Sequence, residues 1–96
     1  MNKIKEFQEW YLSYCDDEWE HDFGIKIETL DNPGWSIEIN LIGTKNENAQ
    51  FDKIKIERTE DDWVQVWVEN KVFNSACGPL NLEEVLGIFL KWAKKK

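Results

Sequence analysis

The side chains best suited to chemistry lie together in one short segment, residues 16–22. This segment holds five acids, one tryptophan and the only histidine of the chain, in the order Asp16, Asp17, Glu18, Trp19, Glu20, His21 and Asp22. A histidine beside carboxylates could act as a general base, or could join carboxylate oxygens in binding a metal ion. The spacing matches no defined zinc or calcium motif, so three interpretations stay open: a solvated acidic loop, a metal site and a protein-contact surface.

Cys77 is the second candidate for chemistry. It precedes Gly78 and Pro79, just before a predicted helix, and a thiolate near a helix N-terminus can have a lowered pKa and act as a nucleophile. The alternative is a small buried cysteine that only packs in the core. A small enzyme that uses His21 with nearby carboxylates, or Cys77, is therefore one of two functional hypotheses. The other cysteine, Cys15, does not form a disulfide pattern with Cys77, and both are expected to be reduced.

A predicted helix over residues 2–15 must position the acidic segment. Ile4, Phe7, Tyr11 and Tyr14 follow one another at spacings of three and four, and Asn2 can cap the helix. The acids follow directly at the helix C-terminus, where partial negative charge makes them unfavourable. Because local rules are often broken at functional sites, this placement favours a functional role for the segment.

The middle of the chain predicts strands. Residues 25–30 and 35–41 alternate apolar with polar side chains, and a Pro33-Gly34 pair between them suits a type II turn. Residues 51–58 and 63–68 predict two more strands, and 72–75 a short fifth one whose exposed edge could support a dimer. Asn81 and Glu84 form a capping-box signature before a second helix that runs to the lysine tail.

This order predicts one domain over residues 1–96 of the α+β class. We expect an antiparallel meander of four or five strands, with the N-terminal and the C-terminal helix packed on one face. Trp63 and Trp67 would point to one face of their strand and Val64, Val66 and Val68 to the other. If the helices cover the valines, the tryptophans lie exposed as candidate interface residues; if not, they belong to the core. Trp10, Trp19, Trp35 and Trp92 are expected to pack in the core or at its edge.

The charge of the chain points to a basic protein as partner. The net charge is −7, and the excess lies in residues 1–48, which carry eleven acids against four bases. Such a field repels nucleic acid and anionic membranes and speeds encounter with a basic protein. The opening residues lack the apolar stretch of a secretory signal, so a cytoplasmic location is expected. No motif calls for a cofactor, and the oligomeric state is left open.

Several motifs together resemble immunity protein family 53 of bacterial polymorphic toxin systems. They are Trp10-Tyr11, Trp19-Glu20-His21, the run from Gly24 to Ile27, and the run from Thr29 to Trp35, followed by the helix from Leu82 to Trp92. The resemblance implies a protein that protects the producing cell by binding a cognate toxin domain, with no catalysis. An acidic inhibitor suits a basic toxin such as a nuclease. Gly34 and Trp35 can serve the turn and the core; the candidate partner-binding residues are Asp16, Asp17, Glu18, Trp19, Glu20, His21, Asp22, Asp31, Asn32, Trp63 and Trp67.

Overall fold

In the sequence, two helices precede the strands and a third follows them. The structure, a computed structural model, describes residues 2–94. Helix α1 spans Lys3–Tyr14, and the side chain of Asn2 accepts a hydrogen bond from the backbone N–H of Lys5 at 3.1 Å, so the predicted cap is present. Helix α2 is a single turn, Trp19–Asp22, within the acidic segment, and helix α3 spans Leu82–Ala93. None of the helices within residues 2–94 has the length and apolar content needed to cross a membrane.

The strands form one antiparallel sheet in the order β1-β2-β5-β4-β3. The α+β class, with a five-stranded antiparallel sheet and a helix at either end of the chain, is confirmed. The order differs from a continuous meander, because the segment after β2 carries the chain to the far edge and β5 then returns beside β2. The bounds are β1 Ile25–Leu30, β2 Gly34–Asn40, β3 Ile54–Thr59, β4 Asp62–Glu69 and β5 Val72–Cys77.

The fifth strand is central, so its expected place at a sheet edge is wrong. It pairs with β2 on one side and with β4 on the other, and the edges of the sheet are β1 and β3. The physical reason is burial: Phe73, Ser75 and Cys77 on β5 are 0–2% exposed, which a strand at the edge would not achieve. The sequence pattern predicted the strand but not the strands with which it pairs.

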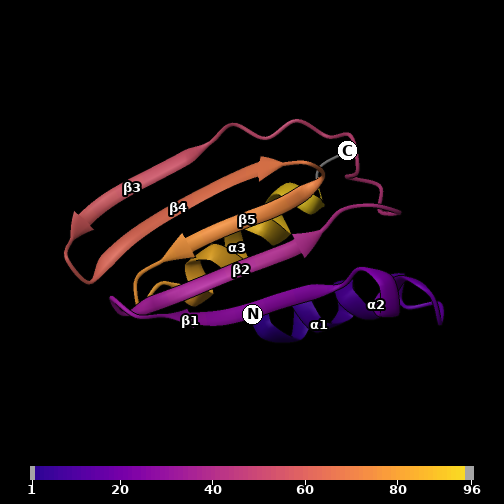
Figure 1. Cartoon of the computed structure of the whole chain (residues 1–96), viewed down its shortest axis with the longest axis horizontal. Helices are drawn as coiled ribbons and strands as arrows, with labels where there is room; N and C mark the ends of the chain where they lie inside the picture. Colours follow the sequence, from indigo (N-terminus) through magenta and orange to yellow (C-terminus); the bar gives the residue numbers. More distant parts are fainter. Residues whose placement is uncertain (1, 95–96) are drawn as a thin grey trace.

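Both long helices cover the same face of the sheet. Figure 1 shows α3 behind the strands, with α1 near the β1 side. Phe89 of α3 meets Phe7 of α1 and Phe73 of β5 in edge-to-face contacts, with ring centroids 5.8 and 4.9 Å apart. Val64 and Val66 lie fully buried under these helices. Because side chains alternate along a strand, Trp63 and Trp67 therefore lie on the opposite, open face.

The turn between β1 and β2 differs from the type II turn expected. A type II turn would need a positive φ at Gly34, but the glycines with positive φ within residues 2–94 are Gly24 and Gly43. Gly34 instead begins β2, opposite Leu30. A Cβ at this position would lie 2.2 Å from the backbone carbonyl oxygen of Cys77. Glycine is thus required because the backbones of β2 and β5 approach closely there, with no left-handed conformation involved.

A polar network joins the start of α3 to the turn between β3 and β4. Asn81 occupies the predicted N-cap position, but its side chain does not cap the helix. Its amide donates to Asp62 at 2.9 Å and to Glu84 at 3.0 Å, and its oxygen accepts from the backbone N–H of Trp63 at 3.3 Å. Arg58 closes the network with ion pairs of 2.7 Å to Asp62 and to Glu84. The capping-box signature located the helix start but not this role.

The network predicts a loss of stability in acid. The pKa of Glu84 is lowered by Arg58 and then by Asn81, and the pKa of Asp62 by Asn81 and then by Arg58. Folded pKa values below the unfolded ones stabilise the protein above the unfolded pKa of about 4, and this stabilisation is lost as pH falls through the folded values. We therefore expect Arg58→Met to flatten the fall in Tm between about pH 6 and about pH 3.

The control for this prediction is Lys55→Met, which removes one exposed positive charge from the same strand, β3. Its Tm should fall with acid as steeply as that of the unaltered protein. Thermal melts at several pH values measure this. An equally steep fall of Tm with decreasing pH in all three proteins would contradict the role assigned to Arg58.

Candidate functional site

The acidic loop, residues 16–22, is built by two of its own carboxylates. Asp16 accepts hydrogen bonds from the backbone N–H groups of Glu18 and Trp19 at 3.0 and 2.9 Å. Glu20 accepts from those of Asp16 and Asp17 at 3.0 and 2.9 Å. Asp16 therefore serves the start of α2, where negative charge is favourable, and Glu20 fixes the backbone that precedes this helix.

These bonds favour the ionised form of both carboxylates. The pKa of Asp16 is lowered by the N–H groups of Trp19 and Glu18. The pKa of Glu20 is lowered by its own N–H and by those of Asp16 and Asp17. At neutral pH the two side chains thus hold the loop in shape as well as contributing negative charge to it.

Trp19 anchors the acidic loop to the core. Its side chain is 5% exposed, and its indole N–H donates to the carbonyl oxygen of Ile42 at 2.8 Å. Its ring meets Trp10 edge-to-face, with centroids 6.0 Å apart. The expectation that Trp10 and Trp19 pack in the core is confirmed. Trp19 therefore positions its exposed neighbours, and its own ring offers little surface to a partner.

The remaining side chains of the loop point to solvent. Asp17, Glu18, His21 and Asp22 are exposed, and none forms a side-chain hydrogen bond or ion pair with residues 2–94. Across the same residues, no group of three or more histidine, cysteine, aspartate or glutamate side chains is placed to hold a metal ion. His21 and its neighbours thus present open charge and hydrogen-bonding capacity on the surface.

Cys77 does not have the reactive environment considered above. Its side chain is 0% exposed in the core, and burial raises the pKa of its thiol to about 11. The sequence suggested the reverse direction because Cys77 precedes a helix, but α3 begins only at Leu82 and the thiol faces the interior. Burial and the raised pKa both disfavour a thiolate at neutral pH, and Cys77 has the environment of a small buried cysteine. Both Cys15 and Cys77 are free cysteines.

Asp31 and Asn32 lie apart from the acidic loop. They are exposed in the turn that joins β1 to β2, whereas the acidic loop precedes β1 at its other end. Figure 1 shows these two regions at opposite ends of β1. The structure therefore does not bring the two groups of predicted contact residues into one site.

Trp63 and Trp67 lie half-buried on the open face of the sheet. Across this face, Trp67 is opposite Asn74, Asn74 is opposite Glu38, and Glu38 is opposite Lys26. A hollow of about 530 Å³ lies beside Trp67 and is lined by Lys53, Gln65, Trp67, Val68 and Glu69. Such a hollow can receive a side chain of another protein, which would then pack against the indole of Trp67.

A second hollow joins the open face to the acidic loop. It measures about 230 Å³ and is lined by Asp22, Phe23, Gly24, Ile25, Lys26, Glu38, Asn40 and Val72. Glu38 lies in the same cross-strand row as Trp67, and Asp22 belongs to the acidic loop. The cross-strand row from Trp67 to Glu38 and this hollow together connect Trp67 with Asp22. Sequence reasoning missed Asn40 and Val72, because only the pairing of β2 with β5 places them together.

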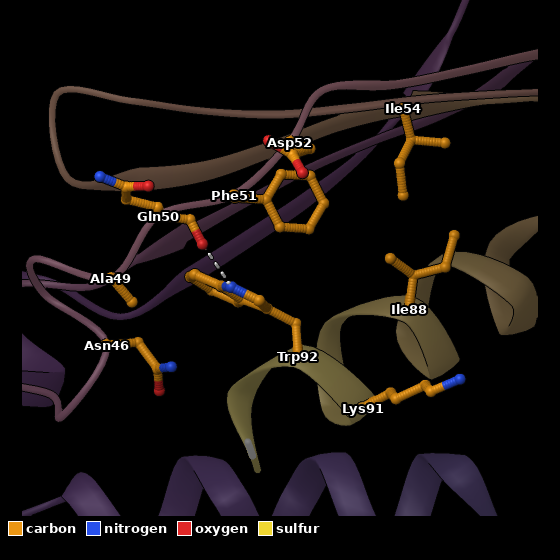
Figure 2. A pocket seen from close by; sticks show the side chains of 9 residues that line it. All are labelled: Asn46, Ala49, Gln50, Phe51, Asp52, Ile54, Ile88, Lys91 and Trp92. Atoms are coloured by element: carbon orange, nitrogen blue, oxygen red, sulfur yellow. Dashed lines mark hydrogen bonds between the residues drawn. The ribbon is translucent and has the colours of Figure 1, made fainter. Parts of the chain in front are cut away.

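Another hollow, about 630 Å³ in volume, lies on the helical side between α3 and the segment that precedes β3. Figure 2 shows Phe51, Ile54, Ile88 and Trp92 around this space. The indole N–H of Trp92 donates to the carbonyl oxygen of Gln50 at 2.9 Å and so fastens the segment to α3. None of the predicted contact residues lines this hollow.

Comparison with protein families gives a match over nearly all of the chain. The model of the family described as immunity protein 53 matches residues 4–94, nearly the whole chain. Comparison with curated proteins and with solved structures finds no match.

Proposed function

The chain belongs to the immunity protein 53 family, and on this premise we propose that it binds one cognate bacterial toxin and blocks it stoichiometrically. The family match over residues 4–94 is the observation that carries the proposal. Immunity of this kind needs no catalysis and no cofactor, since the inhibitor has only to cover the toxin's working surface. We propose that it acts in the cytoplasm of the producing cell.

The proposed partner is a basic toxin domain of the nuclease type. A nuclease must attract phosphates, so its own site carries positive charge. The acidic loop offers Asp17, Glu18 and Asp22 as exposed carboxylates, and Asp16 and Glu20 fix the backbone that presents them. Carboxylates held in place beforehand can enter a positive cleft with little loss of conformational entropy.

The proposed contact surface combines this charge with an aromatic anchor. It runs from the acidic loop, through the hollow lined by Asp22 and Glu38, to Trp67 on the open face. Trp63 extends it along β4. The charges would set the association rate, and the indole would set the residence time.

The proposal is tested by capture and by rescue. The tagged protein is used as bait for the toxin encoded next to its gene, and the two are then expressed together in a growth assay. We expect one-to-one capture and restored growth. If the toxin is neither captured nor neutralised, the proposed function is wrong.

Charge on the acidic loop should govern association. We expect the triple variant Asp17→Asn, Glu18→Gln and Asp22→Asn to lower the association rate constant about 10-fold at low salt, because long-range attraction weakens. These side chains form no internal hydrogen bonds, so the melting temperature should stay close to that of the unaltered protein. Stopped-flow binding at several salt concentrations measures the effect.

The matched control neutralises three exposed acids elsewhere, with Glu60→Gln, Asp61→Asn and Glu83→Gln. It changes the net charge by the same amount, away from the acidic loop. An equal loss of association rate in both triple variants would show that only overall charge matters and would remove the acidic loop from the contact surface.

A further inference from the structure

Strand β1 forms an open and regular edge of the sheet. Figure 1 shows it as the outermost strand on its side. Its pairing with β2 runs without interruption from Ile25 opposite Ile39 to Leu30 opposite Gly34. Four of its six residues are exposed, and Ile27 is 41% exposed, which is high for an isoleucine on the side facing the helices. Such an edge is a template for another strand.

The unpaired backbone groups of this edge can be identified. The backbone N–H of Asn40 donates to the carbonyl oxygen of Gly24 at 3.0 Å, so Gly24 points toward β2. Hydrogen-bonding direction alternates along an antiparallel strand. The N–H and C=O groups of Ile25, Ile27 and Thr29 therefore point outward, and no backbone hydrogen bond from another segment of residues 2–94 reaches them.

The other edge of the sheet is protected. The pairing of β3 with β4 is irregular between Glu57 and Thr59, and the side chain of Arg58 there is bound to Asp62 and Glu84. A bulge and a fixed charge are common means by which proteins prevent pairing at an edge. The two edges thus differ, and β1 is the one open to a partner strand.

We propose that β1 pairs antiparallel with β1 of a second copy of this chain, about a two-fold axis at Ile27. In this register Ile27 faces Ile27 of the second copy, and Ile25 faces Thr29. Lys26 of each copy faces Glu28 of the other. The outward backbone groups of Ile25, Ile27 and Thr29 then all find partners, and the two sheets become one.

The charges of β1 select this register. Moving the strands by one residue would set the outward backbone groups of one copy opposite inward-pointing ones of the other, so the ladder could not form. Moving the axis to Lys26 or to Glu28 would set like charges directly opposite one another, which is destabilising. Within one chain Lys26 and Glu28 form an ion pair of 3.7 Å, and both side chains are about 60% exposed, so each can exchange this partner for the opposite charge of a second copy.

Apolar surface beside the edge supports the same partner. Tyr11 is 36% exposed and Phe23 is 40% exposed, and with Ile25 they line a hollow of about 280 Å³ between α1, α2 and β1. A strand added at β1 would continue the sheet next to this hollow and remove apolar area, including that of Ile27, from water.

The test uses the purified chain alone, so its result is independent of any toxin. Sedimentation equilibrium should give the mass of one chain at low concentration and approach that of two at high concentration. Lys26→Glu and Glu28→Lys should each weaken self-association about 10-fold or more, because attractive pairs become repulsive. The double variant with both substitutions should associate like the unaltered protein, and an equimolar mixture of the two single variants should form a mixed dimer.

Ile27→Pro tests the backbone contacts. It removes an N–H that points outward and leaves the pairing with β2 intact, so the variant should keep the circular dichroism of the unaltered protein and stay a single chain. If this variant does not fold, the test rests on Lys26→Glu, Glu28→Lys and the double variant. A single-chain mass at every concentration, or self-association that ignores the charges of residues 26 and 28, would overturn the proposal.

Discussion

Gly34→Ala should destabilise the fold by about 3 kcal/mol, a large share of the stability of a domain of this size. The added Cβ would lie 2.2 Å from the carbonyl oxygen of Cys77, which belongs to the central strand β5. A backbone oxygen at the end of the central strand cannot turn aside as a side chain can. Strand β2 or β5 would have to shift, and contacts around Ile37 and Cys77 would be lost. The free energy of unfolding in urea measures the effect.

Gly87→Ala is the matched control. A Cβ at Gly87 would lie 2.8 Å from Cε of Lys3, at the far end of a flexible side chain that can move away. Alanine in a helix interior is favoured over glycine by about 0.5–1 kcal/mol, so this variant of α3 should be at least as stable as the unaltered protein. Equal losses at Gly34 and Gly87 would mean that the close approach of β2 to β5 is not what requires glycine.

Local patterns predicted the elements of this fold because each element follows from neighbouring residues. The spacing of Phe7, Tyr11 and Tyr14 predicted α1, and the alternation in residues 63–68 predicted β4 and its two faces. Strand order could not be predicted in this way. The place of β5 between β2 and β4 depends on residues far apart in the chain, and so does the role of Gly34 beside Cys77.

The candidate site shows the same limit. Composition predicted the acidic loop, but it did not separate Asp16 and Glu20, which accept backbone hydrogen bonds, from Asp17 and Glu18, which face solvent. That separation depends on the turn of chain between α1 and α2, including the positive φ of Asp17. The hollow that links Asp22 to Glu38 needed the sheet order as well.

Truncation of Trp67 should give the largest loss of toxin affinity. We expect Trp67→Ala to raise the dissociation rate constant roughly 30-fold, equivalent to about 2 kcal/mol, with a much smaller change in association. The indole lies half-buried on the open face beside a hollow of about 530 Å³, so a partner can enclose it and exclude water. Surface plasmon resonance with the captured toxin measures both rate constants.

Leu80→Ala provides the control, since Leu80 is 87% exposed on the connection between β5 and α3, away from Trp67 and from the acidic loop. Its removal should leave both rate constants unchanged. The acidic-loop triple variant and Trp67→Ala then separate the two halves of the surface, since charge acts before contact and the indole acts after it. When the triple variant and Trp67→Ala are combined in one protein, their losses of binding free energy should add if the two regions bind independently. A normal dissociation rate for a folded Trp67→Ala protein would place the anchor elsewhere and leave the acidic loop as the contact.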